Sequence, residues 1–132
     1  MKIFDQNYSG LVKAMDLSYK RHMLLTSNIA NSETPNFRAR ELDFGGELEK
    51  ALVTEQSEMR TADARHFSGN GDSGGARTVL DTSGEIGADG NNVDLDIQMG
   101  KISTNGEMYQ DAISFVSTKL RILRSAFNRG GI

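Results

Sequence analysis

Residues 71–75 spell Gly-Asp-Ser-Gly-Gly, the string that surrounds the nucleophilic serine of chymotrypsin-like serine proteases. That chemistry needs a histidine base beside the serine, an aspartate behind the histidine, and two β-barrels that hold all three. His66 is the nearest histidine, and the chain shows barely one strand where two barrels need many. We therefore interpret this stretch as a loop, and an enzyme that uses Asp72 and Ser73 is kept only as a minor alternative.

The same stretch places Gly69, Gly71 and Gly74 at the spacing of a dinucleotide-binding fingerprint. Such glycines serve a pyrophosphate only where a strand precedes them and a helix begins at them. Here a polar run precedes the glycines and a β-like run follows them, so this context is missing. The glycines indicate a flexible loop, and we expect no cofactor.

Metal-binding residues are also poorly placed. His22 and His66 belong to different segments, and the chain has no cysteine for a thiolate ligand or a disulfide. The acidic stretch near residue 90 lacks the ordered spacing and the distal glutamate of a calcium loop. Its members are Asp89, Asn91, Asp94 and Asp96, and we interpret them as helix-capping residues. We expect no catalytic and no metal site.

The composition describes a small, polar chain. It has 132 residues, a net charge of −3, 37% hydrophobic and 7% aromatic residues, which suits one domain without a large core. No basic surface for nucleic acid is evident. No stretch approaches the ~18 apolar residues of a membrane span. The chain turns polar directly after Met1, so we expect no cleaved signal peptide.

The clearest pattern lies in the C-terminal third, where apolar residues are spaced alternately by four and three. This heptad spacing predicts a long helix with one narrow apolar seam, weakened only at Gly106. Asn92 is a plausible N-cap, and basic residues crowd the last turns before Gly130. The seam members are Leu95, Met99, Ile102, Tyr109, Ile113, Val116, Leu120, Leu123 and Phe127.

The N-terminal segment repeats this pattern in a less apolar form, with Pro35 marking its end. Its main seam members are Leu11, Met15, Leu25 and Ile29, and together with the C-terminal seam they form the predicted assembly seam. A second apolar stripe runs beside it through Val12, Tyr19 and Met23. Since two helices cannot bury all of this surface, neighbouring molecules are implied.

These elements predict a mainly α fold in which two long terminal helices pair as an antiparallel coiled-coil hairpin. We expect one discontinuous assembly domain formed by residues 1–35 and 92–129, because neither helix is stable alone while its apolar seam is exposed to water. Residues 36–91 form a loop-rich middle segment with little β structure. It should hold an extended piece, a short helix, a short strand at 77–80, and a flexible glycine-rich part at 68–91.

Residues 28–37 resemble the signature shared by the flagellar rod and hook axial proteins, Asn-Ile-Ala-Asn, two variable residues, Thr-Pro-Gly-Tyr. The matching residues are Asn28, Ile29, Ala30, Asn31, Thr34 and Pro35, while Asn36 and Phe37 stand where Gly and Tyr are usual. Asn tolerates left-handed backbone angles, so the first departure is mild. Residues 38–44 and 90–96, and the pair Tyr109-Gln110, further resemble the proximal rod members of this family.

The resemblance implies a non-enzymatic structural subunit that self-assembles through its terminal helices into the proximal end of the axial drive shaft. The implied partners are the rod proteins FlgC, FlgF and FlgG, FliE and through it the MS ring, and the flagellar type III export gate. The implied location is the periplasmic rod of the basal body. A helical adaptor or a secretion-system filament protein with the same hairpin is the alternative.

We call residues 28–37 the elbow. Asn28 and Asn31 lie near a predicted helix end, where amide side chains can bind exposed backbone carbonyls and redirect the chain. Pro35 then determines the exit angle. The elbow is interpreted either as an ordinary capped turn or as a rigid bend that positions a neighbour contact.

Overall fold

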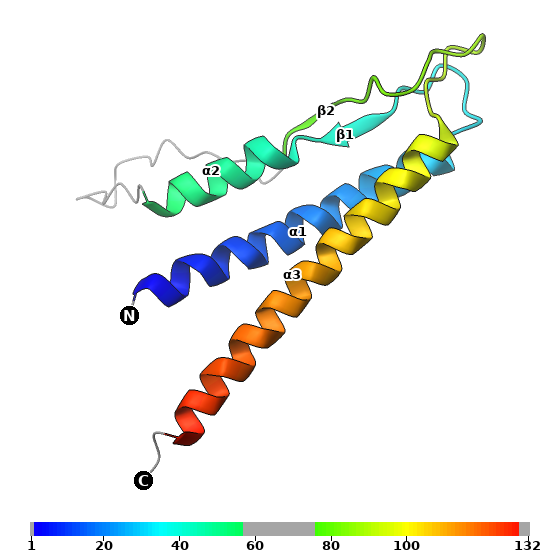
Figure 1. The fold of residues 1–132 in the computed structure, drawn as a ribbon. Helices are drawn as coiled ribbons and strands as arrows, with labels where there is room; N and C mark the ends of the chain where they lie inside the picture. The colour runs from blue at the N-terminus through cyan, green and yellow to red at the C-terminus, as the bar shows by residue number, and fades with distance from the viewer. Residues whose placement is uncertain (1, 57–75, 130–132) are drawn as a thin grey trace, which may run out of the picture.

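The computed structural model describes residues 2–56 and 76–129. The elements in this part of the chain are helix α1 (Lys2–Ala30), strand β1 (Arg40–Leu42), helix α2 (Phe44–Gln56), strand β2 (Thr78–Leu80) and helix α3 (Leu95–Arg129), as Figure 1 shows. The predicted mainly α class, with two long terminal helices and a short helix between them, is confirmed. The predicted short strand is confirmed as β2.

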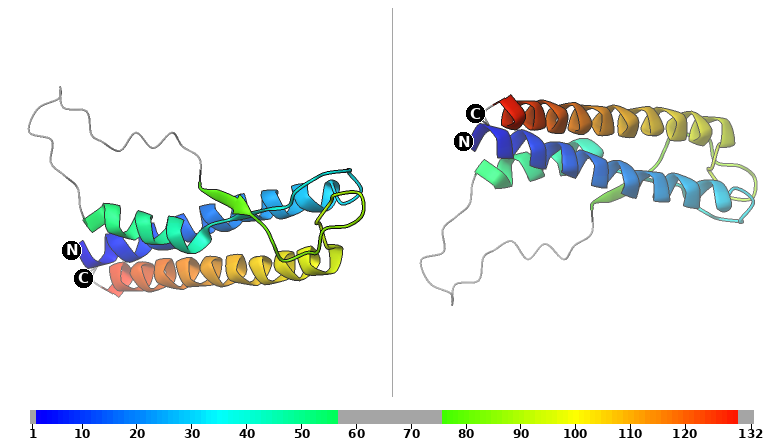
Figure 2. Two further views of the ribbon diagram at one scale, coloured as in Figure 1. Left: turned by 90° about the horizontal axis from the view of Figure 1, so that it is seen from above. Right: turned by 90° about the horizontal axis from the view of Figure 1, so that it is seen from below.

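Helix α1 is the central element, because α3, α2 and β1 all pack against it. Helices α1 and α3 run in opposite directions, and the start of α1 lies at the same end of the molecule as the end of α3 (Figures 1 and 2). Helix α2 lies beside the N-terminal part of α1 (Figure 2). In the described part of the chain, no helix combines the length and the apolar character needed to cross a membrane.

The sheet is a short antiparallel pair. Its register joins Arg40 to Leu80, Glu41 to Val79 and Leu42 to Thr78. One more backbone bond follows at the end of β2, where the Asp81 N–H donates to the Ala39 carbonyl at 2.9 Å. The strand β1 turns Leu42 toward α1 and the interior, while β2 is exposed along its length.

The interior of the described chain is small and largely polar. The buried apolar side chains are Leu17, Leu25, Ala39, Leu42 and Ala112. The buried polar side chains are Ser18, Asn28, Asp81, Asn91, Asn92, Gln98 and Asn105. Because a polar group buried without a hydrogen bond is costly, such an interior depends on specific partners for each side chain.

Only part of the C-terminal seam lies on the buried side of α3. Ile102, Val116 and Leu123 are partly buried, and Tyr109, in the same seven-residue spacing, lies at the margin of the contact. We call these four residues the central row. On one side of it lies a buried row, Gln98, Asn105 and Ala112, continued by the partly buried Lys119, and we call it the polar row because of its two amide side chains. On the other side lies an apolar row, Met99, Ile113, Leu120 and Phe127, which is between 38% and 77% exposed.

The expectation that the two apolar seams bury each other within the chain is therefore wrong for the apolar row, and also for Leu95, which is exposed. The physical reason is that Gln98 and Asn105 find hydrogen-bond partners on α1, which the apolar row could not use. On α1, Leu25 is fully buried and Leu11, Met15 and Ile29 are partly buried.

Candidate functional site

The elbow begins where α1 ends at Ala30. A series of tight turns follows, in which the Ser32 N–H donates to the Ile29 carbonyl at 3.1 Å and the Thr34 N–H donates to the Asn31 carbonyl at 3.0 Å. The Asn31 side chain donates to the Ser27 carbonyl at 2.8 Å, which confirms the carbonyl-binding role predicted for it. The helix thus ends before Pro35 is reached, and Pro35 itself is exposed.

Asn91, which is distant from the elbow in sequence, binds the elbow backbone through its side chain. Its buried amide nitrogen lies 2.9 Å from each of three backbone carbonyls, those of Asn31, Ser32 and Thr34. These carbonyls belong to the turns that follow the end of α1 at Ala30, so this one amide fixes the path of the chain after the helix. Sequence reasoning assigned Asn91 to capping of its own helix and missed this role, although residues 90–96 were part of the resemblance.

Two residues with a left-handed backbone conformation lie next to each other near Asn91. Asn36 has a φ of 60° and Gly90 a φ of 79°, and the Asn36 N–H donates to the Asp89 carbonyl at 2.9 Å. A side chain at position 90 would meet the Asn36 Oδ1 at 2.5 Å, so glycine is required there both by φ and by space. Asn36 adopts the left-handed conformation expected of an Asn in the place of the signature's glycine.

Asn28 binds a backbone carbonyl, as predicted, but this carbonyl belongs to β1 and not to the end of its own helix. Its side chain pairs with the backbone of β1: Oδ1 accepts from the Arg40 N–H at 3.0 Å, and Nδ2 donates to the Arg40 carbonyl at 2.8 Å. The same Nδ2 donates to the Gln98 Oε1 at 3.0 Å. One buried amide therefore joins α1, β1 and α3.

A group of charged and polar side chains continues from Gln98, and we call it the clasp: Arg21, Asn28, Glu41, Asp81, Gln98 and Lys101. Lys101 Nζ lies 2.5 Å from Asp81 Oδ2 and 3.1 Å from Glu41 Oε2. Arg21 Nε donates to Glu41 Oε1 at 2.8 Å, and Gln98 Nε2 donates to Asp81 Oδ2 at 2.9 Å. The clasp ties α1, β1, the end of β2 and α3 together with two carboxylates and two cations.

Both carboxylates of the clasp have lowered pKa values. Burial acts to raise the pKa of Asp81, but hydrogen bonds from Lys101, Ser83 and Gln98 outweigh it and hold that pKa far below its ordinary range. Burial likewise raises the pKa of Glu41, and the bonds from Arg21 and Lys101 outweigh it. Both groups are thus charged at neutral pH, which suits structural ion pairs rather than proton transfer.

Asn92 is a bridge and not the N-cap that we predicted. Its buried side chain accepts from the Ala39 N–H at 2.8 Å and donates to the Asp81 carbonyl at 2.6 Å. The N-cap of α3 is Asp94, whose Oδ1 accepts from the Ile97 N–H at 3.1 Å. The physical reason is that the Asn92 amide is already bonded to the backbones of Ala39 and Asp81, so it does not cap the helix.

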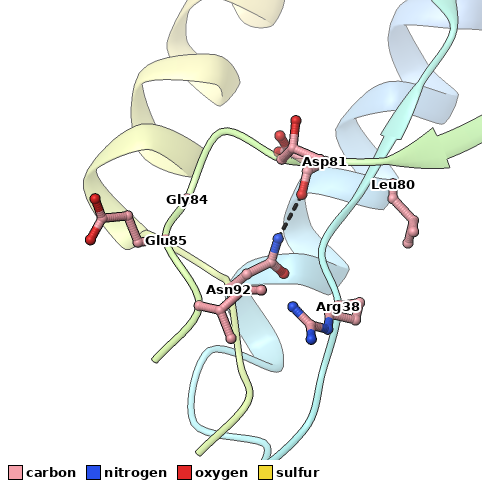
Figure 3. A pocket seen from close by; sticks show the side chains of 8 residues that line it. Arg38, Leu80, Asp81, Gly84, Glu85 and Asn92 are labelled. Carbon is pink, nitrogen blue, oxygen red and sulfur yellow. Dashed lines mark hydrogen bonds between the residues drawn. The ribbon is translucent and has the colours of Figure 1, made fainter. Parts of the chain in front are cut away.

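A shallow pocket lies beside this bridge (Figure 3). Its lining residues are Arg38, Leu80, Asp81, Thr82, Gly84, Glu85, Ile86 and Asn92. In Figure 3 the Asn92 side chain points toward the Asp81 backbone, to which it donates. Asp81, the buried carboxylate of this lining, is bonded to Gln98 and Lys101 of the clasp.

Gly84 lies in the pocket wall at a point with no room for a side chain, because a Cβ there would overlap the Asn92 carbonyl oxygen. We expect Gly84→Ala to lower the free energy of unfolding by about 1–3 kcal/mol, the usual penalty of overpacking. Gly100 on α3 is the matched control, because a Cβ there meets no atom within 4 Å. Gly100→Ala should raise the free energy of unfolding by about 0.5–1 kcal/mol. Urea unfolding followed by circular dichroism measures both, and equal effects would contradict the assignment.

The motifs that resemble a serine protease and a dinucleotide-binding site belong to residues that the structure does not describe. His66, Asp72, Ser73 and the glycines at 69–75 fall outside the described residues. Within residues 2–56 and 76–129, no group of three or more His, Cys, Asp or Glu side chains is placed to hold a metal ion.

The outer faces of the helices are the remaining candidate surface. In addition to the apolar row, α3 exposes a second line of apolar side chains spaced by seven, Met108, Phe115 and Ile122, which flanks the polar row on the side away from the central row. On α1 the predicted second stripe, Val12, Tyr19 and Met23, is exposed as expected. Apolar faces of this length on a chain with so small an interior are typical of surfaces that other molecules cover.

These features define a class: a helical structural subunit with a hydrogen-bonded interior and apolar helix faces turned outward. Comparison with known proteins agrees. The chain is 32% identical over 114 residues to the flagellar basal body rod protein FlgB of Cereibacter sphaeroides strain ATCC 17029, covering 86% of this chain and 88% of that protein. It is 30% identical over 123 residues to FlgB of Aeromonas hydrophila, covering 93% of both chains.

A more distant relative is FlgB of Salmonella typhimurium strain LT2, 27% identical over 124 residues that cover 89% of this chain and 90% of that protein. No protein-family model matches the chain. The chain belongs to the FlgB family of flagellar basal body rod proteins, and it is a structural subunit of the flagellar basal body.

Proposed function

We propose that the chain builds the proximal end of the flagellar rod through its terminal helices. In this proposal residues 1–35 and 92–129 act as one assembly domain, in which α1 and α3 pair as an antiparallel coiled-coil hairpin. The observation that carries the proposal is the apolar row of α3, which stays exposed beside a buried polar row. Neighbouring subunits would cover this row, together with the exposed stripe of α1, and so complete the assembly seam.

The elbow serves this assembly as a rigid bend. Asn91 holds three of its carbonyls, and Asn28 links the end of α1 to β1 and to Gln98. A bend held from several elements keeps one geometry, so it presents its exposed tip, residues 33–36, in a constant direction. We infer that this tip meets a neighbouring subunit.

The partners in this proposal are the rod proteins FlgC, FlgF and FlgG, together with FliE, which connects the rod to the MS ring. The chain works in the periplasmic part of the basal body. It reaches that location through the flagellar type III export gate, without a cleaved signal peptide. Membership of the FlgB family supports these assignments.

Deletion of the gene in the bacterium that carries this chain tests the proposal. We expect the deletion strain to build no complete rod and to lose swimming, and the intact gene supplied in trans to restore both. A density map of the isolated basal body should place the chain next to the MS ring. A helical adaptor would leave complete rods in the deletion strain, and a filament protein of another secretion system would leave swimming intact.

A further inference from the structure

The rotational setting of α3 on α1 does not follow its apolar pattern. The helix turns Gln98, Asn105 and Ala112 toward the interior, while Ile113, Leu120 and Phe127 stay exposed. Asn105 is only 2% exposed, and its Oδ1 has no hydrogen-bond partner. Its Nδ2 donates to the Ser18 carbonyl at 2.9 Å. If burial of apolar surface alone determined the rotation of α3, a polar row with an unsatisfied oxygen would not be the buried one.

A second setting is available to the same two helices. The central row lies between the polar row and the apolar row, about 40° from the former and about 60° from the latter on a helix of 3.6 residues per turn. A turn of α3 by about 50° about its own axis would therefore keep the central row against α1 and exchange the two rows. In that setting Ala112 would be exposed and Leu120 would be buried.

The contacts that favour the observed setting are concentrated in the clasp. Gln98 can bond to both Asn28 and Asp81 only while the polar row faces inward. Lys101, one turn further along α3, reaches Asp81 and Glu41 from the same side of the helix. Hydrogen bonds to ionised groups are the strongest of the polar contacts, and several of them act together here.

We propose that the clasp determines which face of α3 meets α1, and that it thereby keeps the apolar row outward and available to other molecules. Since a helix is stiff over several turns, the setting imposed at Gln98 and Lys101 extends along α3 toward its C-terminal end. Release of the clasp removes the polar preference, and α3 then turns so that the apolar row packs on α1.

Single cysteines report this turn, because the chain has none of its own. Ala112→Cys marks the polar row, which is buried, and Leu120→Cys marks the apolar row, which is exposed. In the otherwise unchanged chain, we expect a soluble thiol reagent to modify the thiol at position 120 at least tenfold faster than the thiol at position 112. The rates are measured on the full purified chain, and the turn is independent of whether the chain assembles into a rod.

The clasp is released by the paired change Asp81→Asn with Lys101→Met, which removes both charges of its shortest ion pair. We expect the order of the two rates to reverse, with the thiol at position 112 faster by at least threefold. The control is Lys20→Met, which breaks the exposed ion pair with Asp16 on α1 and should leave the order unchanged. An unchanged order in the clasp variant would overturn the proposal. Equal, fast rates at both positions would also overturn it, because α3 would then have left α1.

A further variant distinguishes a rotation of α3 from a general loss of packing between α3 and α1. Gln98→Leu and Asn105→Leu, added to the clasp variant, make the polar row apolar and so favour the original setting without the ion pairs of Lys101. The original order, with the thiol at position 120 faster, should return. Failure of this rescue, with position 112 still the faster site, would show that the rows do not compete for α1 and would overturn the proposal.

Discussion

Replacement of Ile113, Leu120 and Phe127 by serine is expected to abolish swimming and to leave the stability of the isolated chain nearly unchanged. These side chains are 38%, 51% and 77% exposed, so they contribute little to the fold of one molecule. Substitutions at such surface positions usually change the free energy of unfolding by only about 0.5 kcal/mol each. In an assembly the same three losses recur at every subunit interface, and burial of each side chain contributes roughly 1.5–3 kcal/mol there.

Three exposed apolar residues away from the long helices provide the matched control. Val79, Leu80 and Ile86 are 38%, 63% and 61% exposed, so their replacement by serine removes a similar apolar surface. The control strain should swim as the parent strain does. Swimming in soft agar, isolation of basal bodies and urea unfolding of the purified chains are the measurements. Normal rods in the helix variant would show that the apolar row of α3 is not an assembly surface.

Asp81→Asn is expected to cause the largest loss of stability among the single changes considered, about 2–3 kcal/mol. The side chain is buried and takes part in bonds with Lys101, Gln98 and Ser83, and its removal leaves the Lys101 ammonium with one carboxylate partner fewer. Loss of a hydrogen bond to a charged group costs about 1.5–3 kcal/mol, and a buried pair that loses one member costs more than an exposed one. Asp111→Asn, on the exposed face of α3, is the control and should be nearly neutral.

The pH dependence follows from the lowered pKa of Asp81. A carboxyl group whose pKa is lower in the folded state stabilises the fold above its ordinary pKa of 3.8, and this contribution is lost as the pH falls through the lower folded value. The unfolding free energy of the parent chain should therefore decline below about pH 4. That of Asp81→Asn should decline less steeply, and the lowered pKa values of Glu41 and Glu47 contribute to the decline that remains. Parallel acid profiles of the two chains would contradict this role for Asp81.

The clasp also explains why the heptad pattern predicted only half of the helix contact. The spacing of Ile102, Tyr109, Val116 and Leu123 correctly marked the central row of α3, because apolar spacing identifies a face. It could not tell on which side of that row the partner lies. That choice depends on polar groups of other elements, such as Asn28 and Asp81, whose positions the spacing of α3 does not contain.

The elbow likewise has features that local sequence predicts and one contact that only the tertiary structure reveals. Its turn and the left-handed Asn36 were predictable, because they depend on the backbone preferences of a few adjacent residues, although the helix ends at Ala30, before Pro35. The closing residue, Asn91, lies 57 to 60 residues away along the chain from the carbonyls it binds. Nothing in the local pattern distinguishes it from an ordinary helix-capping asparagine.

The sequence by itself therefore determined the long terminal helices, the short helix and strand between them, the bend at the elbow and the family resemblance. Each of these depends on local periodicity, backbone preference or a contiguous motif. Only the tertiary structure decided the rotation of α3 on α1, the partners of Asn28, Asn91 and Asn92, and the formation of the clasp. The physical reason is that a buried amide or carboxylate is stabilised by whichever partner the fold brings within hydrogen-bonding distance, and residue type alone does not say which partner that is.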